Sequence, residues 1–307
     1  MTTALISHPA CSRHDMGRFH PERPARLGAV NDALIEAGIA DLLMHCQAPR
    51  VTRQQLERVH DKAYIDYLES HAPLAGNWEL DHETIMNPFT LEAARRAAGA
   101  VVHGVELVMS GRADNAFCNI RPPGHHAEHD LGMGFCFFNN VAVGAAHALQ
   151  QEQIRKVLIV DFDLHHGNGT EEIFQDSPQV IICSSFQHPN YPDKPFARDS
   201  QRIINVTLQA GEGSIDFRNR VADSWFPAIE SHQPDLFLIS AGFDAHGNDP
   251  LSELRLTAED YYWITGRLVE LADRHAQGRI VSCLEGGYDL KALGLSAAAH
   301  IRALMKL

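Results

Sequence analysis

The segment Val157–Gly169, VLIVDFDLHHGNG, joins four consecutive apolar residues to a polar loop that contains two aspartates and two histidines. Its apolar part, Val157–Val160, is rich in β-branched residues with no polar residue in alternation, which is typical of a strand covered on both faces. Residues Gly169–Phe174 then predict a short helix. A buried strand that leads through a polar loop into a helix is the unit of parallel α/β sheets. The segment therefore predicts an α/β protein.

The same alternation of apolar strands and helical patterns recurs along the chain, which has no internal repeat and no linker rich in Pro, Gly or Ser. We therefore expect one domain, residues 1–307, with a mostly parallel sheet and helices on both faces. Asn140 and Thr257 are predicted N-caps, and Gly278 is a predicted helix stop. The other predicted strands are Val180–Cys183, Leu236–Ile239 and Ile280–Leu284, and the other predicted helices are Leu91–Met109, Val141–Gln151, Ile215–His232, Ala258–Ala276 and Leu290–Met305.

Composition excludes several classes of protein. Hydrophobic residues make up 45% of the 307 residues and charged residues 21%, a balance that supports a sizeable core and excludes disorder over most of the length. No stretch reaches the roughly 18 apolar residues that a membrane span needs, and the N-terminus lacks the pattern of a secretory signal. The six cysteines form no CxxC pair, which favours reduced thiols and predicts a cytoplasmic protein.

The net charge of −13 bears on possible partners. Proteins that bind nucleic acids usually carry a basic surface, and this chain has no block of Lys or Arg, so direct nucleic-acid binding is disfavoured. A negative field favours cationic partners such as Lys-rich polypeptides or polyamines, although negative charge also serves solubility alone. The sequence leaves a homo-oligomer open.

A candidate metal site begins directly after the strand Val157–Val160. Asp161, Asp163 and His165 are spaced by two, so an extended backbone would aim all three side chains to one side. With Asp244, which follows another predicted strand, Asp163 and His165 would form a three-ligand site with an open position, as in catalytic zinc sites. The alternative is that Asp161 and Asp163 cap the next helix or bind surface water.

His125 and His126 are candidates for general acid–base catalysis. They lie in a loop fixed by Pro and Gly, and two neighbouring imidazoles can act as base and acid if their pKa values differ. Asp161 and Asn168 are available as the partners that would set the two rings apart. The alternatives are that the pair binds the metal itself or merely packs.

Tyr288 follows the last predicted strand in the sequence Glu285-Gly286-Gly287-Tyr288. The two glycines allow a close approach of the backbone that side chains would block. Tyr288 would then donate its hydroxyl group to an oxyanion beside the metal. The alternative is a packing role for the ring.

Together these motifs resemble the zinc-dependent histone deacetylase family. RPPGHHA, GFCFFNN, DFDLHHGNG, AGFDAHGNDP and LEGGYDL occur in the family's order, and residues 20–27, HPERPARL, resemble its N-terminal pattern. Glu285 in LEGGY and Asn168 in HHGNG resemble the residues found in the class II and bacterial branch of the family rather than in class I. The resemblance covers about residues 8–305 and implies the arginase/deacetylase fold, with a parallel sheet of about eight strands. It also implies removal of acetyl or other acyl groups from lysine side chains or similar N-acyl amines.

The resemblance assigns roles residue by residue. The loop 81–88 departs from the family pattern, so no residue that grips the substrate backbone is assigned there, and Tyr191 lies in a segment that also departs from it. The implied zinc ligands are Asp163, His165 and Asp244; the catalytic residues are His125, His126 and Tyr288; the supporting residues are Asp161 and Asn168; the tunnel residues are Gly134, Phe135, Tyr191, Leu251, Gly286 and Gly287; and the structural potassium sites are Asp161, Asp163, His165, Ser184 and Ser185, and Phe174, Ser177 and Val180.

Two alternative functions stay open beside a lysine deacylase. An acetylpolyamine amidohydrolase would perform the same chemistry on a small cationic substrate, but Leu251 stands where polyamine-selective members of the family place a glutamate. A catalytically weak scaffold that binds acyl-lysine is disfavoured, because every residue that matches the catalytic set is intact. The ligand types alone do not exclude iron(II) in place of zinc.

Overall fold

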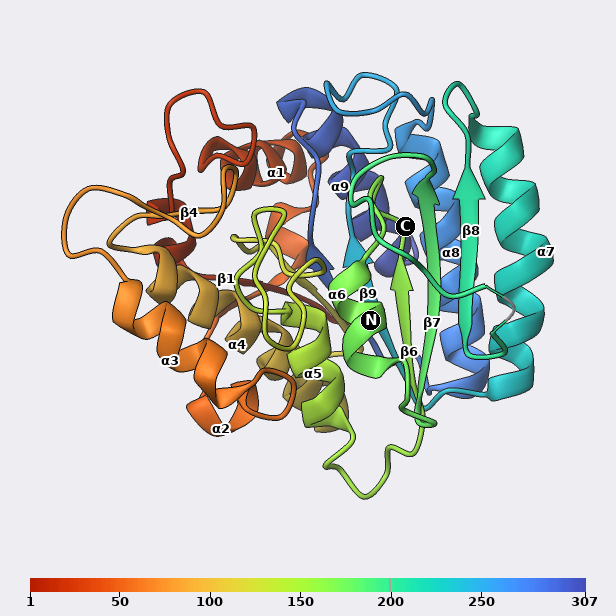
Figure 1. Ribbon diagram of the computed structural model, residues 1–307. Helices are drawn as coiled ribbons and strands as arrows, with labels where there is room; N and C mark the ends of the chain where they lie inside the picture. The colour runs from red at the N-terminus through yellow and green to blue at the C-terminus, as the bar shows by residue number, and fades with distance from the viewer. Residues whose placement is uncertain (199) are drawn as a thin grey trace.

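The computed structural model describes residues 1–198 and 200–307, and eight parallel strands form its central sheet (Figure 1). The strand order is β2-β1-β5-β10-β9-β6-β7-β8, and a separate antiparallel pair is formed by β3 and β4. This confirms the predicted α/β class and the expected size of the sheet. The bounds are β1 Thr3–Ser7, β2 Met44–Gln47, β3 Trp78–Glu79, β4 Ile85–Met86, β5 Asn115–Cys118, β6 Val157–Asp161, β7 Val180–Gln187, β8 Ile203–Leu208, β9 Leu236–Ala241 and β10 Ile280–Leu284.

Helices cover both faces of the sheet, so the central strands are buried along their whole length (Figure 1). On one face, α4 and α5 pack on each other and on strands β5, β10, β9 and β6. On the other, α1, α9, α8 and α7 pack side by side in that order. The bounds are α1 Ala25–Glu36, α2 Arg53–Leu56, α3 Lys62–His71, α4 Thr90–Met109, α5 Asn140–Ala148, α6 Asn168–Phe174, α7 Ser214–His232, α8 Ala258–His275 and α9 Leu290–Leu304.

Helix ends agree with the predictions except at α5. Thr257 caps α8 through a capping box with Asp260, and Gly278 adopts a positive φ of 78° just beyond the end of that helix. The predicted cap Asn140 is wrong, because the residue before it, Asn139, accepts the amide hydrogen of Ala142. Asn140 is the first helical residue, and its amide group instead donates to the carbonyl oxygen of Pro122 over 3.1 Å.

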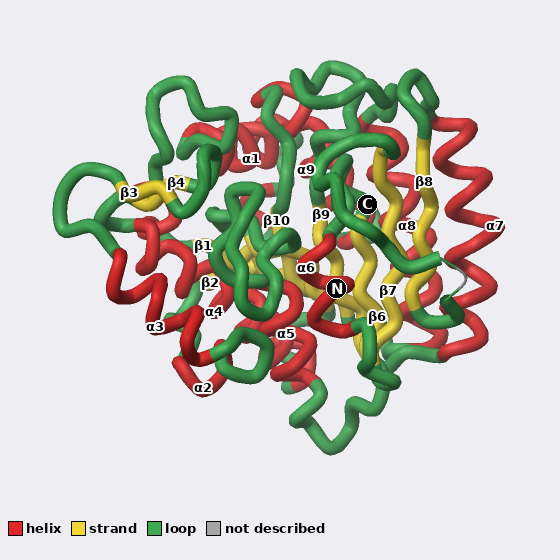
Figure 2. Tube along the Cα trace, viewed as in Figure 1, coloured by secondary structure: helices red, strands yellow, loops and turns green. Residues whose placement is uncertain are grey.

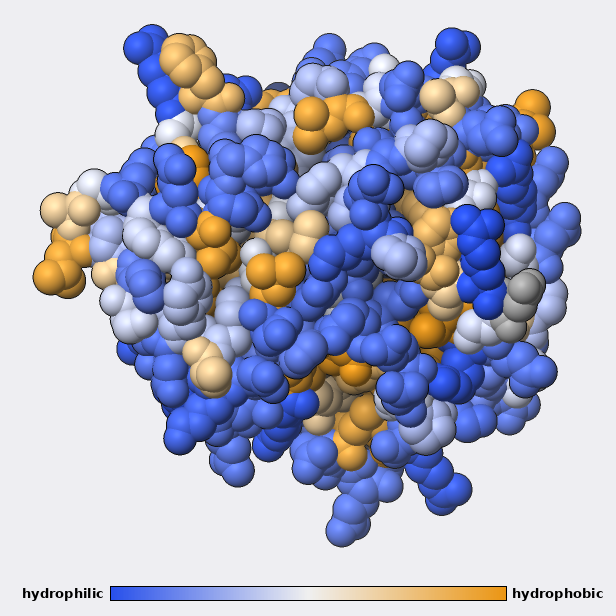
Figure 3. Space-filling view, in the orientation of Figure 1, coloured by the Kyte–Doolittle hydropathy of each residue, from blue (hydrophilic) through white to orange (hydrophobic). Residues whose placement is uncertain are grey.

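One continuous apolar core extends across the sheet and the helices on it, and the assignment of residues 1–307 to a single domain remains a prediction. The face shown in Figure 3 is largely hydrophilic, with apolar residues scattered over it. No helix within the described ranges is both long and apolar enough to cross a membrane.

The parallel strands all direct their carboxyl ends to one edge of the sheet, where long loops gather (Figure 2). Three neighbouring strands at this edge, β10, β9 and β6, precede the loops that carry Tyr288, Asp244 and Asp163. The carboxyl edge of a parallel sheet is where such folds bind ligands. The topology thus brings residues that are far apart in the sequence to one place.

Candidate active site

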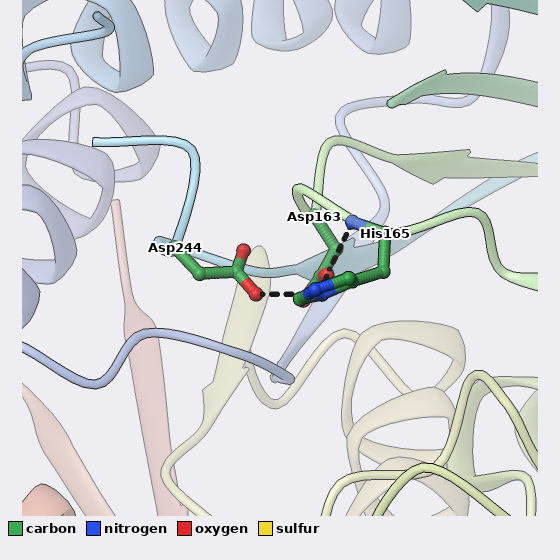
Figure 4. Close-up of side chains that lie close together, drawn as sticks. All are labelled: Asp163, His165 and Asp244. Atoms are coloured by element: carbon green, nitrogen blue, oxygen red, sulfur yellow. Dashed lines mark hydrogen bonds and ion pairs between the residues drawn. The ribbon is translucent and has the colours of Figure 1, made fainter. Parts of the chain in front are cut away.

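Asp163, His165 and Asp244 point toward one another at this edge (Figure 4). The Nδ1 atom of His165 lies 3.1 Å from Oδ1 of Asp163 and 3.2 Å from Oδ2 of Asp244. All three residues are buried, and one potential ligand atom from each lies within 4.8 Å of the others. Among the described residues this is the group whose spacing suits a metal ion. The structure thus brings the predicted ligands together.

Backbone amides fix the two carboxylates in place. The amide hydrogen of Leu164 is donated to Oδ1 of Asp244 over 2.8 Å, and that of Gly286 to Oδ2 of Asp163 over 2.8 Å. Oδ2 of Asp244 is buried and accepts no hydrogen bond from the described residues, because its ion-pair contact with Nδ1 of His165 at 3.2 Å lacks hydrogen-bond geometry. A buried carboxylate oxygen in this state is costly unless a cation meets it.

The two carboxylates create a negative potential that favours a bound proton or cation among these three side chains. Burial and the nearby Asp163 charge raise the pKa of Asp244 to about 7. Burial lowers the pKa of His165, but the adjacent carboxylates of Asp163 and Asp244 outweigh this and raise the pKa to about 10. A divalent cation could take the place of the proton on Nδ1 and satisfy both carboxylates.

Gly286 leaves room for the carboxylates, which leads to a first prediction. A Cβ atom at this position would overlap both Asp244 and Asp163. We expect Gly286→Ala to weaken zinc binding by about 10- to 100-fold, as is common when the support of a metal ligand is disturbed. Competition with a chromogenic chelator measures this affinity. Gly266→Ala, where an added Cβ meets nothing within 4 Å, is the matched control, and equal affinities of the two variants would contradict the prediction.

The two neighbouring histidines have different partners. Nδ1 of His125 lies 2.9 Å from Oδ2 of Asp161, a carboxylate, whereas Nδ1 of His126 lies 2.8 Å from Oδ1 of Asn168, a neutral amide. The rings are 4.0 Å apart between centroids. His126 lines the cavity described below, and His125 is not among the described residues that line it.

These partners separate the two pKa values. Burial lowers the pKa of His125, but the charges of Asp161 and Asp163 outweigh it and raise the pKa to about 10. Burial and the positive charge of His125 hold the pKa of His126 well below its usual range. A nearby dication would lower both values, yet their order persists because only His125 pairs with a carboxylate. The His125 ring is thus protonated and can donate a proton, whereas the His126 ring is neutral and has one unprotonated nitrogen.

Tyr288 faces the same cavity from the loop after β10. Its ring packs edge-on against Phe135, with centroids 5.9 Å apart, and the Arg26 guanidinium lies 5.0 Å from the ring centroid. Arg26 also donates to the carbonyl oxygens of Glu285 and Gly287, which fixes the glycine turn before the tyrosine. Burial and the Asp244 charge raise the pKa of Tyr288 well above its usual value, so its hydroxyl group stays protonated as a donor.

A cavity of about 410 Å³ joins these groups. Tyr191 packs edge-on against both His126 and His165, with centroids 5.2 and 6.0 Å apart, and Leu251 is partly exposed in its wall. Gly286 and Gly287 were expected in this wall but are not among the described lining residues, because Gly286 faces the Asp244 and Asp163 carboxylates and Gly287 faces Leu293 and Phe243. The cavity is lined by His20, Pro21, His82, Glu83, His126, Gly134, Phe135, His165, Asn190, Tyr191, Leu251 and Tyr288.

The structure also adds residues that sequence analysis missed as supports of the site. The Glu285 carboxylate accepts the amide hydrogens of Gly124 and His125, over 2.6 and 3.3 Å, and so holds the histidine loop. Oδ2 of Asp249 accepts the amide hydrogen of Tyr288 over 2.6 Å, and its Oδ1 accepts that of Leu251 over 3.1 Å. Both carboxylates lie inside motifs that the sequence analysis identified. The closeness of Glu285 to Tyr288 and of Asp249 to Asp244 in the sequence is the feature that could have indicated their supporting role.

The residues expected to bind potassium lie at the end of β6, on β7 and in the segment that connects these strands through α6. Asp161 and Ser184 are paired in register on neighbouring strands, and the Ser184 hydroxyl is buried with no hydrogen-bond partner among the described residues. In the second expected set, the carbonyl oxygen of Ser177 already accepts a hydrogen bond from the Arg202 guanidinium. Phe174 ends α6 and Val180 begins β7, on either side of Ser177.

Comparison with known proteins gives consistent matches. A family model described as the histone deacetylase domain matches residues 20–304. A "Probable deacetylase" of Archaeoglobus fulgidus is 32% identical over 95% of this chain and 82% of its own length. "Polyamine deacetylase HDAC10" of Homo sapiens is 32% identical over 99% of this chain and 48% of its own length. The crystal structure of the HDA15 HD domain superposes with a TM-score of 0.92 at 33% identity, covering 99% of this chain and 90% of that one.

Proposed function

The chain belongs to the histone deacetylase family, and from this we propose that it is a zinc-dependent amidohydrolase that removes acetyl or other acyl groups from lysine side chains or similar amines. One observation carries the proposal: the candidate metal ligand His165, the imidazole of His126 and the phenol of Tyr288 line a single cavity. A metal site, a base and a hydrogen-bond donor around one cavity suit the hydrolysis of an amide.

Asp163, His165 and Asp244 fit zinc. One imidazole and two carboxylates are ordinary zinc ligands, and three protein ligands leave a position open, as in catalytic sites. Two buried carboxylates close together, one with an oxygen that accepts no hydrogen bond from the described residues, and the raised pKa values of Asp244 and His165 support a cation at this place. Zinc supplies Lewis-acid chemistry there, withdrawing charge from an acyl carbonyl and acidifying water.

The protein's own residues would carry the proton transfers. His126 lines the cavity and its Nδ1 is engaged by Asn168, so its Nε2, which has no hydrogen bond to the described residues, accepts the proton of the attacking water. His125, held by Asp161, donates a proton to the departing amine. Tyr288 donates its hydroxyl hydrogen to the oxyanion that develops from the carbonyl group. Phe135 and Tyr191 shield the apolar stem of the substrate from water.

For potassium, we propose only the first of the two expected sites. The buried, unpartnered hydroxyl of Ser184 beside Asp161 fits an oxygen-lined monovalent cation site. The second set fits poorly, because a cation at the carbonyl oxygen of Ser177 would face the Arg202 guanidinium already bound there.

Turnover of a fluorogenic acetyl-lysine peptide, with and without chelator, tests the proposed function. We expect hydrolysis that chelator abolishes. A protein that binds acyl-lysine or an inhibitor but does not turn over the peptide, in the presence of zinc, would instead support the scaffold alternative. Parallel kinetics with longer acyl-lysine peptides and with acetylated polyamines would identify the preferred substrate.

A polyamine deacetylase is the second candidate function. It is favoured by the human relative named for that activity and by Glu83, a carboxylate in the cavity wall that a distant ammonium group could meet. Against it stands Leu251, which offers the same ammonium no partner and would leave it desolvated. We therefore rank lysine deacylation first.

Changing Leu251 to glutamate tests this ranking. The side chain is 39% exposed in the cavity wall, so a carboxylate there can face a cation at the cavity mouth. We expect Leu251→Glu to raise kcat/KM for acetylspermidine relative to the acetyl-lysine peptide by about tenfold, the effect of one partly exposed ion pair. Leu251→Gln, similar in size but neutral, is the control. A parent protein that already prefers acetylspermidine by tenfold would contradict the ranking.

A cytoplasmic location and the absence of nucleic-acid partners stay predictions. All six cysteines are free in the structure, and five of them are buried, which agrees with a reducing compartment. The proposed partners are acylated lysine peptides or small N-acyl amines, and a homo-oligomer stays open.

A further inference from the structure

The amide of Asn168 joins His126 to a carboxylate on the opposite side. Its Oδ1 lies 2.8 Å from Nδ1 of His126, and its Nδ2 donates to Oε1 of Glu128 over 2.7 Å. Weaker contacts of Nδ2 reach the carbonyl oxygen of His126 at 3.4 Å and Sδ of Met133 at 3.5 Å. Asn168 is 4% exposed, so water cannot readily replace these partners.

The carboxylate of Glu128 decides which way the amide points. An ionised carboxylate only accepts hydrogen bonds, so it selects the NH2 end of Asn168 and repels the oxygen end. The oxygen end must then face Nδ1 of His126, which can form this hydrogen bond only as a donor. A hydrogen on Nδ1 of the neutral ring leaves Nε2 free.

We propose that Glu128 is a positioning residue that, through Asn168, keeps His126 in the tautomer protonated on Nδ1. The assignment rests on the proposed function in so far as His126 is the base of that reaction. With the amide reversed, its NH2 group would face Nδ1 and favour the proton on Nε2, the atom that must accept a proton from water. Glu128 thus acts on the reaction without touching the substrate.

Lys194 forms an ion pair with Glu128. Its Nζ lies 2.5 Å from the same Oε1 atom, and the two side chains are 33% and 13% exposed. Lys194 follows Tyr191, which packs on His126, in the loop after β7. The loop is therefore connected to His126 in two ways. Tyr191 packs directly on the imidazole ring, and Lys194 is linked to it through Glu128 and Asn168.

A double-mutant cycle separates positioning from simple structural support. In the parent we expect Glu128→Met to lower kcat for the acetyl-lysine peptide about tenfold with KM within twofold, because the amide loses the partner that orients it. Glu128→Gln, which retains an acceptor oxygen, should recover most of the loss. In an Asn168→Asp background, Glu128→Met should cost no activity, since a carboxylate at 168 accepts from Nδ1 in either orientation. An equal loss in both backgrounds overturns the proposal.

Glu172→Met is the matched control. Glu172 lines the same small cavity of about 150 Å³ as Glu128 and Asn168, but it accepts hydrogen bonds from His129 rather than from Asn168. It should change kcat less than twofold. If Glu172→Met lowered kcat as much as Glu128→Met, the loss would result from removing any negative charge from this cavity. That result would overturn the proposal.

The histidine tautomer can also be read without turnover. In the zinc-loaded protein labelled with ¹⁵N-histidine, we expect the ring of His126, assigned by its absence from the spectrum of His126→Gln, to carry its proton on Nδ1. Glu128→Met should shift protons toward Nε2, while the zinc content stays equal. A parent ring protonated on Nε2 would overturn the positioning role, whereas a parent with the expected tautomer but no turnover would count against the proposed function alone.

Discussion

Asp244→Ala is expected to remove the metal and the activity together. In the proposed site Asp244 would supply one of three ligand atoms, and the remaining Asp163 and His165 would be too few for a stable site. We expect zinc to fall from about one ion per chain to less than about a tenth. The kcat/KM value should fall about 10³-fold or more, since a catalytic metal ion typically supplies several kcal/mol of transition-state stabilisation.

Elemental analysis of dialysed protein checks the zinc content, and peptide turnover checks the activity. Asp273→Ala is the matched control, because this carboxylate is 44% exposed and pairs only with Lys306 among the described residues. It should retain both zinc and activity. Full zinc occupancy in Asp244→Ala would mean that the ion binds elsewhere, and the ligand assignment would be wrong.

Tyr288→Phe is expected to lower kcat about 10²-fold or more while substrate binding and zinc content are largely kept. The change removes one hydroxyl group and leaves the ring, whose packing against Phe135 and the Arg26 guanidinium holds the loop. The backbone hydrogen bond from Tyr288 to Asp249 is also unaffected. A loss of this size would therefore be due to the removed hydroxyl group, the proposed donor to the developing oxyanion.

Steady-state kinetics with saturating peptide measures this loss. Tyr262→Phe is the control, because the Tyr262 hydroxyl donates to the carbonyl oxygen of Leu307 on the surface, and its removal should leave kcat unchanged. If Tyr288→Phe remains within a few-fold of the parent, the tyrosine has a packing role and the oxyanion is stabilised by other groups.

The elements that the sequence predicted share a strong local pattern. The strands β6, β7, β9 and β10 contain runs of β-branched or apolar residues that are buried on both faces. Such runs are typical of parallel strands covered by helices, so they could be recognised locally. Strand β5, NAFC, is as buried but has only four residues and starts with asparagine, so its position is set by pairing with β1 and β10. Such pairing is invisible in a local window.

The candidate site was predictable to the same extent. Asp163 and His165 are two residues apart after a clear strand, and Tyr288 follows a glycine pair, so their grouping follows from strand ends. The supporting carboxylates could not be assigned, because Glu285 contacts Gly124 across 161 positions and Glu128 contacts Asn168 across 40. The wrong N-cap at Asn140 shows that a local pattern can also be ambiguous, because Asn139 and Asn140 are equally suitable cap residues by type. A distant contact separates them, since the Asn140 amide donates to the Pro122 carbonyl oxygen while Asn139 caps the helix.

A zinc titration of metal-free protein tests whether hydrolysis depends on one zinc ion per chain. Turnover of the acetyl-lysine peptide is followed as zinc is added in steps to protein stripped by chelator, with bound zinc measured at each step. We expect activity to start near zero, to rise in proportion to bound zinc and to reach its plateau at about one ion per chain. Turnover that is already maximal without metal, or one equivalent of tightly bound zinc with no turnover, would contradict this expectation.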